Sequence, residues 1–336
     1  MIFKRKETAE DLLSRRPIWQ RITYVVLGVI VMVNLGLAWY WSRSPDVFWV
    51  NQGPASGSPI VGYATTDSLI RVAETLLDKP GGYLTNDVAP PGVFLDNIPN
   101  WELGVLQQVR DLARVTRNDH SRSQSQSRED VDLAVAEPKI FFDNDSWVFP
   151  PSESEYRDAI EGFISYRERL SVGASDAQFF ARADNLREWL AQVEKRLGSL
   201  SRRLGDSVVQ DVINTDLAGD RAATASSNLP DRVQVRTSWF EIDDIFFEAR
   251  GTAWALVHFF RAAEFDFANV LEDKNAETSV RQIIRELEAS LAPLRSPMVL
   301  NGGGYGLFAN HSLVMANYLA RANAAVINLR ELLDQG

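Results

Sequence analysis

The sequence lacks cysteine altogether and has only three histidines among its 336 residues. Without cysteine, the chain has no disulfide, no thiolate metal ligand and no thiol nucleophile. The histidines are His120, His258 and His311, and none has another histidine three or four positions away, which excludes an H-E-x-x-H zinc helix. We therefore expect neither a metal ion nor a cofactor.

Other catalytic signatures are missing as well. The chain contains neither a G-x-x-x-x-G-K-S/T phosphate loop nor a G-x-S-x-G nucleophile elbow. Basic residues are in deficit, because the net charge is −10 although residues 1–21 hold six basic and three acidic side chains. Once these and Arg43 are set aside, residues 44–336 carry −14. A domain this acidic is not expected to bind nucleic acid.

One long stretch, Ile22 to Trp41, has no charged side chain. A helix of this length rises about 30 Å, which matches the hydrocarbon thickness of a bilayer. Tryptophan and tyrosine lie at both of its ends, as is typical of interfacial positions. A cleaved signal peptide fits less well, because its apolar core is about 7 to 15 residues long and ends at a small-x-small site. A buried core helix rarely stays uncharged over such a length. We predict a transmembrane helix over residues 22–41, in contact with the lipid bilayer.

The charges that flank this stretch predict its orientation. After Arg43, no Lys or Arg occurs before Arg71, and basic residues are retained on the cytoplasmic side of membranes. We expect residues 1–21 to be a cytoplasmic basic segment and the rest of the chain to be extracytoplasmic. The basic residues of that segment are Lys4, Arg5, Lys6, Arg15, Arg16 and Arg21.

The remainder predicts a mainly α fold: an irregular multi-helix bundle with one small β-hairpin, behind the transmembrane helix. Residues 42–66, rich in Pro, Gly and Ser, are expected to form an extended tether, and residues 67–336 the helical domain. The hairpin is expected over residues 139–149, where two apolar runs flank Asp143–Ser146. Apolar periodicity predicts helices over residues 67–78, from Asn100 onward, and over 152–170, 176–209, 239–271, 278–291 and 310–333.

Polar residues form a row on one of these helices. Asp243, Arg250, Trp254, His258 and Arg261 are spaced by 7, 4, 4 and 3 positions, which places them along one side. Such a row within an apolar segment predicts either a ligand pocket or a network that packs helices together. We favour the packing network, because ion pairs of this kind are common in helical proteins.

A second candidate site lies near the C-terminus. Backbone amides of the loop that contains Gly302, Gly303 and Gly304 are candidates to hold a carboxylate or phosphate, although a flexible turn is the simpler interpretation. In the helix that follows, Asn310, Asn317, Arg321 and Asn328 repeat at spacings of 7, 4 and 7. Polar residues at such positions are more typical of helix register than of a ligand site.

Acidic residues suggest two further kinds of site. The loops Asp143–Ser146 and Asn214–Asp220 are candidates for calcium, but counting from Asp143 places valine and serine where an EF-hand needs glycine and glutamate. A glycosidase would need two carboxylates that face each other across a cleft. Its candidate carboxylates are Glu102, Glu155, Asp184 and Asp244.

Five segments together resemble a proteobacterial inner-membrane family known as domain of unknown function 2333. The resemblance extends from the apolar stretch to the C-terminus, and it implies an inner-membrane anchor with a one-piece periplasmic domain. It brings no catalytic residues. The segments are GGYLTND from Gly81, SRSQSQS from Ser121, ARADNL from Ala181, NTDLAGD from Asn214 and NHSLVMAN from Asn310.

Three functional hypotheses follow from the sequence. The leading one is a non-catalytic scaffold or assembly factor that binds another envelope protein, because catalytic signatures are missing and aromatic residues such as Tyr83, Phe94 and Trp101 lie in or beside loops. The second is a carboxylate-dependent enzyme that acts on cell-wall glycan. The third is a periplasmic ligand-binding module with a pocket near His258 and Arg261.

Overall fold

Long α-helices make up most of the protein. The computed structural model describes residues 18–53, 60–122, 128–173, 176–208, 210–213, 232–235, 237–296, 298–303 and 307–335. The long helices are α2 (Ile18–Trp41), α3 (Tyr63–Asp78), α4 (Asn97–Val115), α6 (Ser152–Ser171), α7 (Ala183–Gly205), α8 (Ile242–Asp266), α10 (Glu277–Ser290) and α11 (His311–Asp334), and the short ones are α5 (Val131–Ile140) and α9 (Ala268–Asp273).

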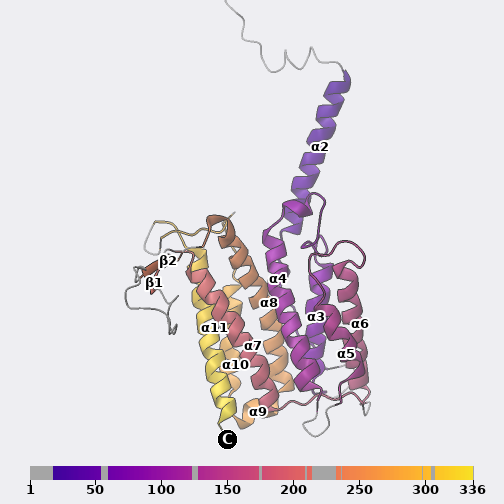
Figure 1. Ribbon diagram of the computed structural model, residues 1–336, viewed down its shortest axis with the longest axis vertical. Coiled ribbons are helices and arrows are strands. Elements are labelled where there is room, and N and C mark those ends of the chain that lie inside the picture. The colour runs from indigo at the N-terminus through magenta and orange to yellow at the C-terminus, as the bar shows by residue number, and fades with distance from the viewer. Residues whose placement is uncertain are drawn as a thin grey trace, which may run out of the picture.

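The helices other than α2 form one bundle. Helices α4 and α8 pack along each other at its centre, with α3, α5 and α6 on one side and α7, α10 and α11 on the other (Figure 1). Helix α2 projects from one end of the bundle, and the C-terminus lies at the opposite end. We call these the α2 end and the far end. The predicted mainly α fold, an N-terminal apolar helix followed by a multi-helix bundle, is confirmed.

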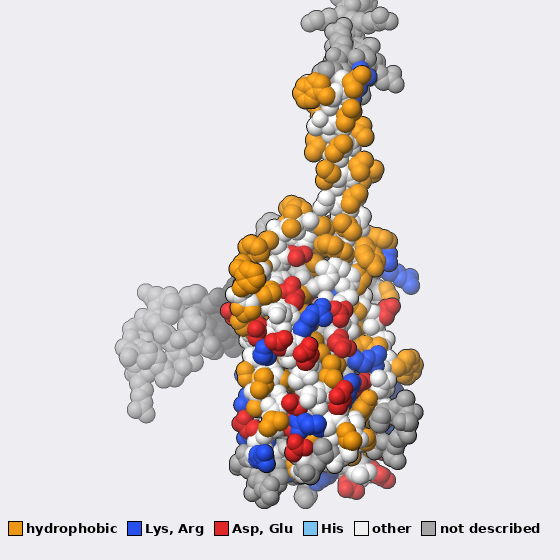
Figure 2. Space-filling model, turned by 90° about the vertical axis from the view of Figure 1, so that its right-hand side faces the viewer, with side chains coloured by type: hydrophobic (Ala, Val, Ile, Leu, Met, Phe, Trp, Pro, Cys, Tyr) orange, Lys and Arg blue, Asp and Glu red, His pale blue; other side chains and the backbone are white. Residues whose placement is uncertain are grey.

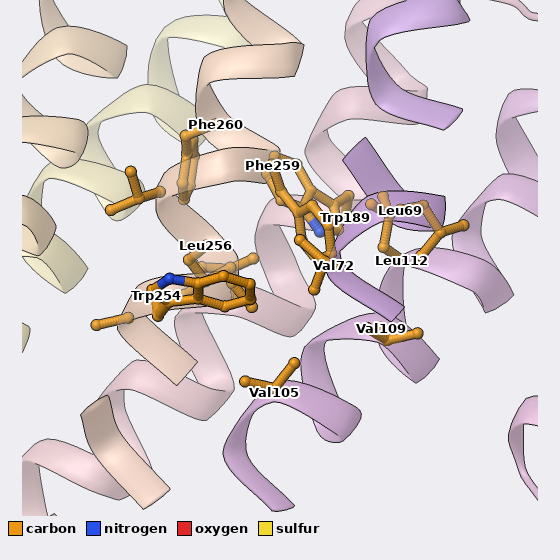
Figure 3. Close-up of a cluster of buried hydrophobic side chains, with 14 of the residues drawn as sticks. Leu69, Val72, Val105, Val109, Leu112, Trp189, Trp254, Leu256, Phe259 and Phe260 are labelled. Atoms are coloured by element: carbon orange, nitrogen blue, oxygen red, sulfur yellow. The ribbon is translucent and has the colours of Figure 1, made fainter. Parts of the chain in front are cut away.

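The core lies where α3, α4, α7 and α8 meet. Figure 3 shows Leu69 and Val72 of α3, Leu112 of α4, Trp189 of α7 and Phe259 of α8, which belong to one buried cluster. The rings of Trp189 in α7 and Phe260 in α8 lie 4.8 Å apart between centroids. Burial of such side chains is the main favourable term in folding, which explains why the apolar periodicity located most of the helices.

Helices α4 and α8 approach each other closely through two glycines. A Cβ atom at Gly104 would lie 2.1 Å from the carbonyl oxygen of Glu248, and one at Gly251 would lie 2.0 Å from that of Trp101. At each glycine, the backbone of the other helix occupies the space where a Cβ atom would lie. The core pair of the bundle has no room for a side chain at either position.

The hairpin predicted over residues 139–149 is wrong in its position. Residues 131–140 form α5, and turns follow up to Ser152. This segment is helical because its buried residues Leu133, Ala136 and Ile140 repeat with a helical period and lie on one face of α5. The two-stranded antiparallel sheet lies elsewhere: β1 (Gln210–Ile213) pairs with β2 (Arg232–Val235), with Gln210 opposite Val235.

Helix boundaries also differ from the prediction, and the caps explain why. Helix α3 begins at Tyr63 rather than Asp67, because the carboxylate of Asp266 in α8 accepts hydrogen bonds from the backbone nitrogens of Gly62 at 2.8 Å and Thr65 at 2.6 Å. Helix α4 begins at Asn97, after the N-cap Asp96, rather than at Asn100. A cap supplied by a distant helix leaves no local signature.

Candidate functional site

Helix α2 projects from the bundle and contacts it only near its last turn. None of its 24 residues is buried, and among the described residues it is the one helix long and apolar enough to cross a membrane. Hydrophobic side chains cover it and gather around its base, where it joins the bundle (Figure 2). The backbone of Gly81, in the loop after α3, lies against the indole of Trp41. The last turn of α2 therefore contacts the bundle.

The chain that follows α2 is extended and is held by the polar row predicted on α8. The backbone nitrogen of Phe48 donates a hydrogen bond to Nε2 of His258 at 3.1 Å, and Arg261 donates one to the Phe48 carbonyl at 3.3 Å. The indole nitrogen of Trp254 donates to the Asp46 carbonyl at 3.2 Å. These three members of the row bind the protein's own backbone.

His258 acts in this contact as a neutral imidazole. Its Nδ1 lies 2.7 Å from the Trp254 carbonyl, so that Nδ1 carries the hydrogen and Nε2 accepts from Phe48. Burial, together with the nearby Arg261 and Arg71, lowers the pKa of His258 to about 3. Because the unfolded chain takes up this proton near pH 6.5, the contribution of His258 to stability is complete above that pH and declines as the pH falls towards 3.

Helix α3 holds the other side of the same segment. Arg71 donates a hydrogen bond to the Trp49 carbonyl at 2.6 Å, and its guanidinium lies 4.0 Å from the centroid of the Phe48 ring. Asn51 donates to Asp67 at 2.9 Å. The segment Pro45–Asn51, which we call the clamped segment, is thus fixed between α3 and α8.

Substitution of His258 by leucine is expected to release the clamped segment without unfolding the bundle. The variant removes the acceptor for the Phe48 amide, which then exchanges with solvent. In hydrogen–deuterium exchange on the full chain, a peptide that covers residues 45–53 should exchange at least tenfold faster than in the native protein, while peptides from α4 should not change. Equal exchange in the two proteins would contradict this role for His258.

The two remaining members of the row have other positions. Arg250 donates to the carbonyls of Ser290, Leu291 and Ala292 at 3.4, 3.1 and 3.0 Å, which pairs a cation with the C-terminus of α10. Asp243 lies in the first turn of α8 and does not join the contacts around His258. Burial, followed by the charges of Asp243 and its acidic neighbours, raises the pKa of the adjacent Asp244 to about 6.

A cavity of about 760 Å³ lies beside the clamped segment at the α2 end. Its walls combine the aromatic rings of Trp101, Phe247 and Trp254 with the cationic side chains of Arg43 and Arg250. Residues 42–47, the start of α4, the first half of α8 and the chain after α10 all contribute to it. Two smaller hollows, of about 280 and 360 Å³, adjoin Phe48 and Arg250.

The C-terminal candidates lie apart from this row. Asn310 caps α11 by accepting from the Leu313 nitrogen at 2.8 Å, and its amide donates to the Gly302 carbonyl at 2.8 Å. Nothing lies within 4 Å of a Cβ placed at Gly303. Arg321 pairs with Glu286 at 2.6 Å, and Asn317 is exposed. Gly304 lies outside the described residues, so the anion cradle stays a prediction.

The sequence interpretation missed a buried ion pair at the α2 end. Lys79 and Glu102 both have fully buried side chains and contact each other directly. Glu102 also accepts from the backbone nitrogens of Leu84 at 2.9 Å and Thr85 at 2.8 Å. Lys79 also donates to the carbonyls of Leu76 and Gly82. The sequence did contain a sign of this pair. Glu102 follows Ile98 by four residues and so lies on the apolar face of α4, where a charged side chain needs a buried partner.

The carboxylates considered for catalysis are engaged in separate places. Glu102 is enclosed, Glu155 pairs with Lys139 at 3.4 Å, and Asp184 pairs with Arg182 at 3.1 Å. Asp244 accepts a hydrogen bond from Asn100 at 2.7 Å. Within the described parts of the chain, no three His, Asp or Glu side chains are grouped as a metal site would require.

Of the two candidate calcium loops, only the first is described. The Asp143 and Ser146 carbonyls accept from the Ser152 hydroxyl at 2.6 and 3.1 Å. The second loop, residues 214–220, lies wholly outside the described residues, so calcium binding there stays a prediction.

Comparison with known proteins gives one match. Neither the curated proteins nor the solved structures contain a significant match to this chain. A family model described as an uncharacterized protein conserved in bacteria (DUF2333) matches residues 13–336, which is nearly the whole chain and includes α2. The resemblance noted from the sequence is thereby confirmed, and the chain belongs to the DUF2333 family of bacterial proteins.

Proposed function

We propose that the protein is a single-pass protein of the bacterial inner membrane, with its N-terminus in the cytoplasm and its bundle in the periplasm. Its role is that of a non-catalytic scaffold or assembly factor, which binds another cell-envelope component. The apolar α2 supports the membrane span, and the basic residues before it support the orientation.

The clamped segment is the observation that carries this proposal. A domain on a flexible tether samples many positions, whereas Phe48 is bonded to α8 through both its amide and its carbonyl. The bundle is therefore held in a fixed position at the end of α2. A fixed position is useful to a protein that aligns a partner with the membrane, because it lowers the entropic cost of assembly.

A reporter enzyme that is active only outside the cytoplasm tests the topology. Fused after Gln335, it should be active, and fused after Pro17, before α2, it should be inactive. The reverse pattern would overturn the orientation.

Cross-linking in intact cells tests the scaffold role. A defined envelope protein should be recovered with the native chain, and its yield should fall at least fivefold with the double variant His258→Leu, Arg261→Ala, which removes both hydrogen bonds between Phe48 and α8. The matched control is Arg281→Ala, which removes surface ion pairs from α10 to Glu277 and to Glu264 of α8 and should leave the yield unchanged. Recovery of no partner with the native chain would contradict the scaffold role.

A periplasmic ligand-binding module is the second candidate, and the cavity beside the clamped segment favours it. A volume of about 760 Å³ with aromatic walls and two cationic groups lies in the range of small-molecule sites. Leu294→Trp places a larger side chain in this cavity. If the cavity holds a ligand, this variant should fail to restore the phenotype of cells that lack the protein, while the cross-linked partner is still recovered.

A further inference from the structure

Large apolar side chains are strongly exposed in three loops of the bundle. The exposed fraction is 78% for Phe94, 97% for Phe149, 101% for Leu307 and 73% for Phe308. Monomeric soluble proteins rarely expose many large apolar groups close together. We call seven exposed apolar residues of these loops the apolar rim: Val93, Phe94, Trp147, Val148, Phe149, Leu307 and Phe308.

All three loops lie at the α2 end. The first joins α3 to α4 and contacts Trp41 through Gly81. The second joins α5 to α6 and is bonded to the first, because Asn86 donates to the Ser146 carbonyl at 2.7 Å. The third joins α10 to α11 and starts at the carbonyls that Arg250 holds, beside the cavity that residues 42–47 also line. The rim therefore lies at the same end of the bundle as the base of α2, where Figure 2 shows hydrophobic side chains gathered on one face.

The rim loops also have few charges. Residues 296–310 contain no charged side chain, and residues 141–151 contain two aspartates but no Lys or Arg. On the same face of the bundle, farther from α2, Lys, Arg, Asp and Glu side chains are frequent (Figure 2). A water-facing loop has no reason to avoid charge, whereas a loop that enters the boundary of a bilayer does.

We infer that the apolar rim enters the interface of the same bilayer that α2 spans, so that the bundle rests on the outer face of that membrane. This inference depends on the membrane span in the proposed function. Trp39 and Trp41 mark the depth of the headgroup layer, and the backbone contact between Gly81 and Trp41 brings the first rim loop to that depth. The exposed rings of Phe94, Trp147 and Phe149 then lie where aromatic side chains partition most favourably.

The geometry favours lipid over a protein as the occupant of this surface. The rim lies at the end of the bundle from which α2 projects, so a protein that covered it would have to fit between the bundle and the bilayer. The attraction is apolar rather than electrostatic, because the rim loops have no basic cluster of the kind that binds anionic lipid. We therefore expect insertion into zwitterionic and anionic membranes alike.

The absence of cysteine allows a direct test on the full chain. Single-cysteine variants are labelled with an environment-sensitive fluorophore and reconstituted in phosphatidylcholine vesicles with or without spin-labelled lipid, which quenches only probes that touch the bilayer. Val93→Cys and Val148→Cys report on the rim, and their native side chains are each 50% exposed. Val131→Cys, at the far end and 58% exposed, is the matched control.

Spin-labelled lipid should reduce the fluorescence of the two rim probes at least twofold and leave the probe at residue 131 unchanged. Replacing a third of the lipid with phosphatidylglycerol should not alter this result. A probe at Gly28, in the middle of α2, separates the two proposals. If residue 28 is quenched and residues 93 and 148 are not, the rim does not enter the bilayer and is left for a protein partner. If residue 28 is not quenched, the membrane span itself is wrong, and the inference falls with it.

Discussion

The variant Gly251→Ala is expected to unfold at a temperature about 6 to 12 °C below that of the native protein. The added methyl group would lie 2.0 Å from the Trp101 carbonyl oxygen and 2.9 Å from the carbon of that carbonyl. These are backbone atoms of a packed helix, so they yield only if α4 and α8 move apart. Overpacking of a core costs about 1 to 3 kcal/mol, and contact with backbone places this variant at or above the upper value.

The variant Gly198→Ala is the matched control. Gly198 also lies inside a long helix, α7, but the nearest atom to an added Cβ is the side-chain nitrogen of Asn323, at 3.4 Å. Alanine in the interior of a helix is favoured over glycine by about 1 kcal/mol. This variant should therefore be as stable as the native protein or more stable.

Thermal unfolding of the full chain in detergent, followed by circular dichroism, checks both variants. Gly104→Ala should behave like Gly251→Ala, because its methyl group would lie 2.1 Å from the Glu248 carbonyl oxygen. If the glycines in α4, α7 and α8 all gave the same melting temperature after substitution, the close approach of α4 and α8 at Gly104 and Gly251 would be contradicted.

Much of the helical architecture follows from apolar periodicity. The stretches predicted at 152–170, 278–291 and 310–333 match α6, α10 and α11 to within one residue at each boundary. Prediction failed where distant parts of the chain decide the local structure. The N-terminus of α3 is capped by Asp266, about two hundred residues later, and no local pattern shows that contact. Helix α5 was not predicted because Phe141 and Phe142, which directly follow it, are residues typical of a strand.

The polar row on α8 shows how far a site can be predicted. Spacing alone placed Trp254, His258 and Arg261 on one side of a helix, and the structure brings these three together around the clamped segment. Their partner was not predictable, because Phe48 reaches them across more than two hundred residues of sequence. Aromatic residues were misjudged for the same reason: Tyr83 and Trp101 are buried, and of the three named only Phe94 is exposed.

The buried pair at the α2 end explains how the loop after α3 is held in place. Glu102 accepts hydrogen bonds from the backbone nitrogens of Leu84 and Thr85, and Lys79 donates one to the Gly82 carbonyl. The two charged side chains thus hold most of the GGYLTND segment in place. Burial lowers the pKa of Lys79 and raises the pKa of Glu102, and the attraction between the two charges opposes both shifts. Glu102 is surrounded by hydrogen-bond donors and Lys79 by acceptors. These partners favour the ionised forms of both side chains over the neutral forms.

The variant Lys79→Met should therefore destabilise the protein severely. It leaves the Glu102 carboxylate buried without its counter-charge, which costs about 3 to 5 kcal/mol. A loss of 1 kcal/mol lowers the melting temperature of a domain of this size by about 2 to 4 °C, so the melting temperature should fall by about 10 °C. Arg157→Met is the matched control, because it removes an ion pair with Asp78 at 2.8 Å whose side chains are 56% and 57% exposed. An exposed pair contributes about 0 to 1 kcal/mol, so this control should melt within about 3 °C of the native protein.

The double variant Lys79→Met, Glu102→Gln separates the lost charge from lost packing. A neutral glutamine accepts from Leu84 and Thr85 through its oxygen, and its amide donates to the Gly82 carbonyl that Lys79 has left. It should recover at least half of the stability lost in Lys79→Met. If the double variant were less stable than Lys79→Met alone, the damage would come from the packing of the lysine chain, and the uncompensated charge would not be its cause.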